Sequence, residues 1–293
     1  MRTWLKSALA RAYAAGGGLR RQHAGRLVVL TFHRVRPDGE IAQARSMRNL
    51  EVPVSDFRRL LVAMRARYEP VALRDGMVRA QPPPRGAFAI TFDDGWADNF
   101  HHAWPVLREL NLPATLFLAT GAVEDRTAFW WQNPALTDHE IERLKHQPAA
   151  RPVPPVAGMA DKRVAGTGDF LTWNQVRDMG CSGLVHFGPH GHRHELMTLL
   201  SREEALADIR RCWQLLQEHV PEAVVPLLSW PNGDAREDLA PDLAALGLQA
   251  AFGTRRGVMS VRDPVRWNLP RNNVDRNMAC HPELLPWLLM RAR

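Results

Sequence analysis

The chain has 293 residues, of which 45% are hydrophobic and ten are tryptophan, so it can bury a substantial core and is not a disordered protein. Its formal net charge is +7, but most of the excess lies in residues 1–26 and the remainder is close to neutral. Without a basic stripe on the body or a recognisable nucleic-acid module, we expect no nucleic-acid partner.

Residues 1–25 are expected to form a basic amphipathic leader helix. Apolar residues recur at helical spacing over Trp4–Tyr13, while Lys6 and Arg11 interrupt any run long enough for a membrane span or a signal-peptide core. This helix could dock on the body or be disordered, or residues 1–24 could lie peripherally on an anionic membrane surface. We expect a cytoplasmic protein, with contact to the inner membrane face as the open alternative.

The three cysteines are widely spaced and form no Cys-x-x-Cys pair. This spacing argues against a disulfide framework and against a cysteine zinc site. Cys212 falls on the apolar face of an expected helix, where cysteine is usually a small core residue. Reduced thiols therefore agree with a cytoplasmic location.

From residue 26 to residue 293, short apolar runs alternate with amphipathic helical patterns, which is typical of βα units around a mainly parallel sheet. Seven such runs suggest an α/β barrel or a strongly curled sheet. The expected strands are Leu27–Phe32, Ala87–Phe92, Ala114–Ala119, Gly183–Phe187, Val224–Trp230, Gln249–Gly253 and Trp267–Val274.

The helices between these runs carry recognisable start signals. A helix near the start presents an apolar face from Phe57 to Met64. Capping boxes are expected at Thr137 with Glu140, at Thr172 with Gln175 and at Ser201 with Glu204.

Residues 122–170 break this rhythm. Trp130-Trp131 is followed by a proline-rich stretch at residues 147–156. Inserts of this length are often lids or binding loops, and adjacent tryptophans suit stacking on sugar faces. A surface excursion without a binding role is the alternative.

Two adjacent carboxylates, Asp93 and Asp94, directly follow the expected strand Ala87–Phe92, which begins with the apolar run 87–90. The carboxyl ends of parallel strands are where active sites of α/β barrels are assembled. Asp-Gly is also a common turn signal, so a solvated turn is the alternative.

A histidine cluster, His190, His192 and His194, follows another strand candidate. If a helical turn begins near Pro189, His190 and His194 share one face and His192 points elsewhere. A polar loop is the alternative, but the glycines and the proline around the cluster favour metal ligands.

Together, Asp94, His190 and His194 offer two imidazoles and a carboxylate, which leave coordination positions open for water and substrate. We therefore expect a divalent metal, zinc before cobalt or another ion. The same ligands suit non-haem iron, so another metal hydrolase or an oxygenase is an alternative. Asp93 beside the ligand can take a proton from water, which favours hydrolysis.

These motifs resemble the polysaccharide deacetylase family, carbohydrate esterase family four, over about residues 26–275. Thr-Phe-Asp-Asp-Gly stands unaltered at Thr91–Gly95, and His-x-x-x-His stands at His190–His194 with Leu196 two residues on. Members of the family remove N- or O-acetyl groups from sugars. The resemblance implies a distorted (β/α)7 barrel.

Other segments resemble family members associated with bacterial surface-polysaccharide assembly. They are Leu30–Val35, Trp130-Trp131 and Leu171–Trp173. The resemblance implies an acetylated bacterial polysaccharide or oligosaccharide as the substrate, with an N-acetyl group expected before an O-acetyl group. It also implies Asp93 as the catalytic base and Asp94, His190 and His194 as the metal ligands.

The third family motif usually reads Arg-x-Pro-Tyr-Gly, whereas the matching stretch here is Ser229–Gly233, without the arginine that orients the base. Arg271 is the candidate replacement, because a guanidinium could hold Asp93 ionised and fixed. A surface ion pair is its alternative. The amide of Asn232 in the Pro-Asn-Gly turn is the candidate donor to an oxyanion.

The late histidine of the family, which protonates the leaving amine, has no clear counterpart. His281 lies in the right part of the chain but in an unconvincing context, and His33 could sit under the site or be a core histidine. A non-catalytic glycan-binding or assembly protein with the same fold is therefore the main alternative to a deacetylase.

Overall fold

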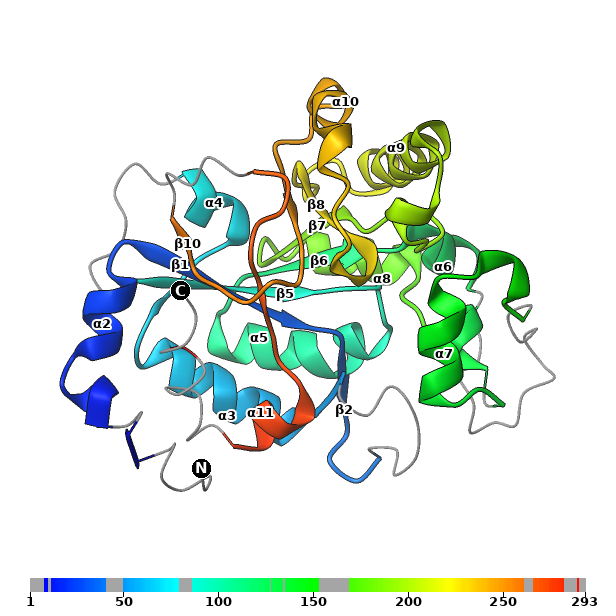
Figure 1. The fold of residues 1–293 in the computed structure, drawn as a ribbon. Helices are drawn as coiled ribbons and strands as arrows, with labels where there is room; N and C mark the ends of the chain where they lie inside the picture. Colours follow the sequence, from blue (N-terminus) through cyan, green and yellow to red (C-terminus); the bar gives the residue numbers. More distant parts are fainter. Residues whose placement is uncertain are drawn as a thin grey trace.

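Figure 1 shows the computed structural model of the chain, in which helices surround a central sheet. Parts of the expected leader helix lie outside the described residues, as does the end of the proline-rich stretch from residue 153. The structure describes residues 8–9, 12–40, 50–78, 86–126, 128–133, 135–152, 169–260, 266–281 and 289.

The central strands are parallel and close into a distorted barrel. β1, β5, β6 and β7 pair in this order, isolated bridges lead from β7 to Val224 and from β9 to Leu269, and β11 returns to β1. The seven strands of this ring are β1 (Arg26–Phe32), β5 (Ala87–Phe92), β6 (Ala114–Leu118), β7 (Val185–Pro189), β8 (Leu227–Ser229), β9 (Ala250–Phe252) and β11 (Asn272–Asn273). The expected α/β fold class, a distorted (β/α)7 barrel, is confirmed.

Three expected strands differ clearly from those observed. The run expected at Val224–Trp230 is reduced to a bridge at Val224 and the short β8. The run expected at Gly183–Phe187 forms β7 two residues later, so that it ends directly before His190. The run expected at Trp267–Val274 is reduced to the bridge at Leu269 and the short β11. Pro270 explains the interruption, because proline has no N–H to donate to a strand ladder.

Further short strands were not expected from the sequence. β4 (Glu69–Pro70) pairs with β5, and β10 (Met259–Ser260) runs antiparallel to the start of β1. β2 (Arg34–Arg36) and β3 (Glu51–Pro53) form a parallel pair just beyond β1. These runs are only two or three residues long, too short for a periodic signal.

Helices cover the outside of the barrel (Figure 1). The expected capping boxes at Thr137, Thr172 and Ser201 are all present. The described α-helices are α2 (Gly18–His23), α3 (Val54–Arg65), α4 (Leu73–Val78), α5 (Trp104–Leu110), α6 (Thr120–Asp125), α7 (Asp138–Lys145), α8 (Trp173–Gly180), α9 (Arg202–His219), α10 (Ala240–Ala245) and α11 (Arg276–Cys280). Single turns of other helix types lie at Asn99–Ala103, Trp130–Gln132, Pro148–Ala150, Met197–Leu199, Pro231–Gly233 and Glu237–Leu239.

The core divides along β1, because successive side chains of a strand point to opposite faces. Val28, Leu30 and Phe32 pack outward against the surrounding helices, whereas Leu27 and Val29 join the cluster inside the barrel. Thr31 continues the inward series, and its hydroxyl lies 3.1 Å from that of Thr91 on β5. The barrel interior therefore turns from apolar to polar toward the carboxyl ends of the strands.

The described part of the leader packs on the barrel. Residues 12–15 are helical, Gly17 adopts a positive φ of 75°, and α2 follows. Leu19 is buried in the main core, and the ring of His23 lies 2.8 Å from the Tyr68 hydroxyl through Nδ1. In the described part of the chain, no helix has the length and apolar character needed to cross a membrane.

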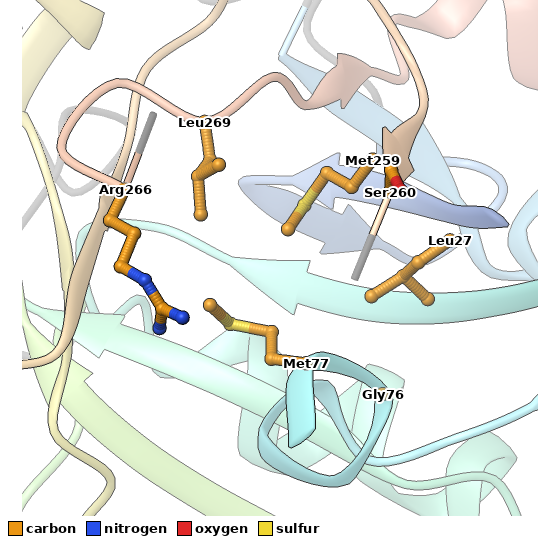
Figure 2. Close-up of a pocket in the computed structure, with 7 residues that line it drawn as sticks. All are labelled: Leu27, Gly76, Met77, Met259, Ser260, Arg266 and Leu269. Carbon is orange, nitrogen blue, oxygen red and sulfur yellow. The ribbon is translucent and has the colours of Figure 1, made fainter. Parts of the chain in front are cut away.

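A small pocket lies at the amino-terminal end of the barrel strands (Figure 2). It is lined by Leu27, Gly76, Met77, Met259, Ser260, Arg266 and Leu269. Leu27 is near the start of β1, at the opposite end from Phe32. This pocket is therefore separate from the polar end of the barrel.

Candidate active site

Polar side chains from several strands meet at the carboxyl ends of the barrel strands. They follow β1, β5 and β7, end β8 or precede β11, which brings residues from distant parts of the sequence to one edge. The residues are His33, Asp93, Asp94, His190, His194, Ser229 and Arg271.

The ligand atoms of Asp94, His190 and His194 all lie within 4.8 Å of one another. Oδ1 of Asp94 is 3.4 Å from Nε2 of His190 and 3.1 Å from Nε2 of His194. Asp94 and His190 are buried, and His194 is half-buried. One carboxylate and two imidazoles that converge in this way fit a divalent cation and leave coordination positions open.

Two of these three groups are anchored through the atom that faces away from the centre. The indole Nε1–H of Trp96 donates to Oδ2 of Asp94 at 2.8 Å. Nδ1 of His190 lies 2.8 Å from the carbonyl oxygen of Ser229, so it carries the proton in this contact and leaves Nε2 to face Asp94. Such contacts orient ligands before a metal arrives.

The backbone that presents the histidines differs from the expectation. No helical turn begins near Pro189, so the condition considered for the sequence is not met, and residues 190–196 form an irregular loop. Gly191 and His194 have positive φ values of 76° and 56°, and this reversal brings His194 back toward His190. His192 points elsewhere, as expected, with Nδ1 3.0 Å from the hydroxyl of Thr120.

Asp93 forms a buried, two-point ion pair with Arg271. Nη1 and Nη2 of Arg271 donate to the two carboxylate oxygens, each at 2.7 Å. Arg271 is 0% exposed and Asp93 is 3% exposed, so the surface ion pair considered above is wrong. The hydroxyl of Ser229 joins the pair, 2.8 Å from Arg271 and 3.2 Å from Asp93.

The charges at the site shift the pKa values of its acids and of His190. Burial by itself would raise the pKa of Asp93, but the charges of Arg271 and then His190 outweigh it and lower that pKa. Burial likewise opposes ionisation of Asp94, yet hydrogen bonds from His190 and His194 bring its pKa well below the usual value. For His190, Asp93 and Asp94 outweigh burial and raise the pKa. Asp93 is therefore ionised at neutral pH.

His33 lies at the site, directly after β1. Its burial lowers its pKa, and the next largest influences on that pKa are the charges of Asp94 and Asp93. Its Nδ1 is buried and has no hydrogen-bond partner among the described residues. His281, in contrast, is exposed at the end of α11, which packs against α3 and β3.

Asn232 lies in the turn Pro231–Gly233 at the end of β8, with a positive φ of 58°. Its side chain is exposed and donates to Asp234 at 2.8 Å. The role expected for its backbone amide stays a prediction.

Trp131 from the insert lies beside the metal-ligand candidate His194. The two ring centroids are 4.9 Å apart, and Trp131 stacks on Phe129 at 4.3 Å. Trp130 is buried instead in a separate cluster with Ile141 and Leu144. The insert therefore reaches the site, with the half-buried Trp131 as its nearest tryptophan.

The support behind Trp96 was not expected from the sequence. Its ring stacks on Phe170 at 4.6 Å, and the guanidinium of Arg34 lies 4.3 Å above it. Arg34 is itself buried and pairs with Asp98 at 2.6 Å and with Asp169 at 3.7 Å. The position of Trp96, two residues after Asp94, was the only signal available for this role.

Comparison with known proteins bears on the family and the fold of the chain. The chain matches the family model described as polysaccharide deacetylase over residues 80–251, and no curated protein matches it. It is similar to the Streptococcus pyogenes deacetylase PplD, solved in complex with acetate, with 19% identity, a TM-score of 0.65, and coverage of 91% of this chain and 99% of that chain. It is also similar to IcaB from Ammonifex degensii, with 19% identity, a TM-score of 0.63, and coverage of 91% and 98%. A third similar structure is the BpsB deacetylase domain from Bordetella bronchiseptica, with 20% identity and a TM-score of 0.57. The match covers 86% of this chain and 97% of that domain. At these identities the likeness shows the fold.

Proposed function

The chain belongs to the polysaccharide deacetylase family, and from this we propose that it is a metal-dependent hydrolase acting on N-acetyl groups of a bacterial polysaccharide or oligosaccharide. The observation that carries the proposal is the placement of an ionised carboxylate beside the candidate metal ligands. Oδ2 of Asp93 lies 3.9 Å from Nε2 of His190, while Arg271 holds Asp93 from the other side.

Asp94, His190 and His194 are the residues that would hold the cation, with zinc expected before cobalt or another divalent ion. A divalent ion bound there supplies Lewis-acid polarisation of an acetyl carbonyl and lowers the pKa of water toward about 7. The anchoring contacts from Trp96 and from the Ser229 carbonyl support this assignment, because ligands of catalytic metals are held in this way.

Asp93 is our candidate for the general base. Its low pKa keeps it ionised, and the two bonds from Arg271 fix the carboxylate in one orientation. A base with a lowered pKa is a weak proton acceptor, so it needs a water whose own pKa is lowered. A divalent ion held by Asp94, His190 and His194 beside Asp93 would lower the pKa of such a water.

The proton that Asp93 accepts must reach the leaving amine, and His33 is our candidate to carry it. His33 lies within the electrostatic reach of Asp93, and its buried Nδ1 has no partner among the described residues. The backbone amide of Asn232 remains our candidate donor to the oxyanion formed from the acetyl carbonyl.

Trp131 supports a sugar as the substrate. A half-buried indole beside His194 gives the site an apolar face, and such faces suit the flat side of a pyranose ring. The ion pair of Arg271 with Asp93 supports a catalytic protein over a non-catalytic glycan-binding one, because a guanidinium beside the candidate base is what the missing motif arginine would supply. The cytoplasmic location and the peripheral contact of residues 1–24 with the inner membrane face remain proposals.

Acetate release from a panel of N-acetylated and O-acetylated glycans tests the function. Zinc-reconstituted wild type should release acetate, and Asp93→Asn should release none while binding the same amount of zinc. Zinc loss from Asp93→Asn would contradict the role of Asp93 as a base outside the ligand set. Tight zinc binding by wild type without release from any glycan would favour the binding protein.

A further inference from the structure

Two of the three candidate metal ligands have an unfavourable backbone conformation. Asp94 and His194 adopt positive φ values of 76° and 56°, in the left-handed region that non-glycine residues rarely occupy. Such conformations cluster at functional sites and persist only where the surrounding structure enforces them. The direction of the His194 imidazole therefore depends on whatever restrains the loop before it.

A buried carboxylate on α9 restrains that loop. Asp208 accepts hydrogen bonds from the backbone N–H groups of His192, at 2.6 Å, and Arg193, at 3.1 Å. These are the two residues that precede His194. Nε of Arg193 also donates to Asp208, at 3.0 Å, and the side chain of Asp208 is 0% exposed whereas that of Arg193 is 57% exposed.

The start of α6 restrains the same loop through other bonds. The N–H of Gly121 donates to the carbonyl of His192 at 2.8 Å, and the N–H of Thr120 donates to the carbonyl of Gly191 at 3.3 Å. The contact with Asp208 is close, since a Cβ atom at position 191 would lie 2.9 Å from its Oδ1. The loop is thus held between the two helices: Asp208 on α9 binds its N–H groups, and the start of α6 binds its carbonyl groups.

We infer that Asp208 is a positioning residue for the metal centre, which sets the left-handed conformation of His194 and aims its Nε2 at Asp94 before the ion binds. This inference rests on the proposed metal site. Asp208 is the group that contacts both amides before His194 and lies outside the ligand set. An asparagine of the same shape has one acceptor oxygen, and its NH2 group would face one of those N–H donors.

The test is the zinc affinity of Asp208→Asn, measured by competition with a chelator well below the unfolding temperature. We expect its Kd to rise about 10- to 100-fold, as for other groups that orient metal ligands. Arg193→Ala is the matched control. It removes the exposed ion pair with Asp208 and leaves both hydrogen bonds from the backbone N–H groups to Asp208. Its Kd should stay within about twofold of wild type.

Different results overturn different claims. A wild-type Kd for zinc in Asp208→Asn would overturn the inference about Asp208 but not the metal site. An equal rise of the Kd in Asp208→Asn and Arg193→Ala would do the same. Wild type that binds no zinc would overturn the metal site and the inference with it.

Hydrogen exchange of metal-free wild type tests the inference without any variant. The amides of His192 and Arg193 should exchange slowly before zinc is added, because the buried carboxylate already holds them. Free exchange in the metal-free protein, with protection only after zinc addition, would overturn the inference even if Asp208→Asn does not fold.

Discussion

Replacing Arg271 by glutamine should leave Asp93 as a buried charge without its partner. The variant loses both bonds to the Asp93 carboxylate and those to the Ser229 hydroxyl and the Gly253 carbonyl. Breaking a buried ion pair by removing one partner typically costs about 3–5 kcal/mol of unfolding free energy. Against a typical domain stability of about 5–15 kcal/mol, this cost removes roughly a fifth or more of the unfolding free energy.

The pH dependence of the same variant has a definite sign. Arg271 is the largest influence that lowers the pKa of Asp93 against burial, so its removal should raise that pKa. In wild type, the lowered pKa contributes stability that is present above the unfolded pKa of the aspartate and is lost as the pH falls through the folded value. In the variant this acid-dependent contribution to stability should shrink or disappear, and the acid limb of kcat/KM should move to higher pH.

Urea unfolding and a pH-rate profile of acetate release measure both effects, with Arg271→Lys as the control. Lysine keeps the positive charge and loses the two-point geometry. The acid limb of kcat/KM should therefore lie at lower pH in Arg271→Lys than in Arg271→Gln. Both variants should bind zinc like wild type. An unchanged unfolding free energy together with an unchanged acid limb in Arg271→Gln would refute the view that Arg271 holds Asp93 ionised.

Three further predictions concern the substrate, the proton and the leader. Trp131→Ala should raise KM for a glycan about tenfold at equal zinc content. The control Trp173→Ala, which removes a ring stacked on His219, should leave KM unchanged. Equal effects of the two substitutions would argue against stacking of a sugar on Trp131. His33→Gln should lower kcat about 100-fold without zinc loss, and wild-type turnover would exclude His33 from proton transfer. Flotation with anionic liposomes should be lost when Arg2, Lys6 and Arg11 are replaced by glutamine. These substitutions leave Leu19, which is buried in the main core, in place. Unchanged flotation would exclude electrostatic contact with the membrane.

Local patterns were sufficient to predict much of the fold. Apolar runs gave the barrel strands because buried parallel strands must be apolar on both faces. The capping boxes at Thr137, Thr172 and Ser201 were predictable because each box joins residues three apart. The weak last strand was overestimated, since Pro270 removes a donor in the middle of an otherwise plausible run.

The candidate site divides in the same way between local and distant information. Asp93, Asp94, His190 and His194 stand in short motifs directly after strands, so their identity and their common edge followed from the sequence. Arg271 lies 178 residues from Asp93, and only the closed barrel puts its guanidinium on that carboxylate. His33 was left undecided for the same reason, because its neighbours come from other strands.

The sequence by itself determined which side chains can bind a metal and at which end of the barrel they lie, because these depend on residue type and strand order. Only the tertiary structure decided how they face one another. The spacing of His190 and His194 suggested a helical turn, yet both imidazoles converge through a left-handed His194. That conformation is unfavourable for an isolated histidine and is enforced by bonds from α6 and α9, which no local pattern contains.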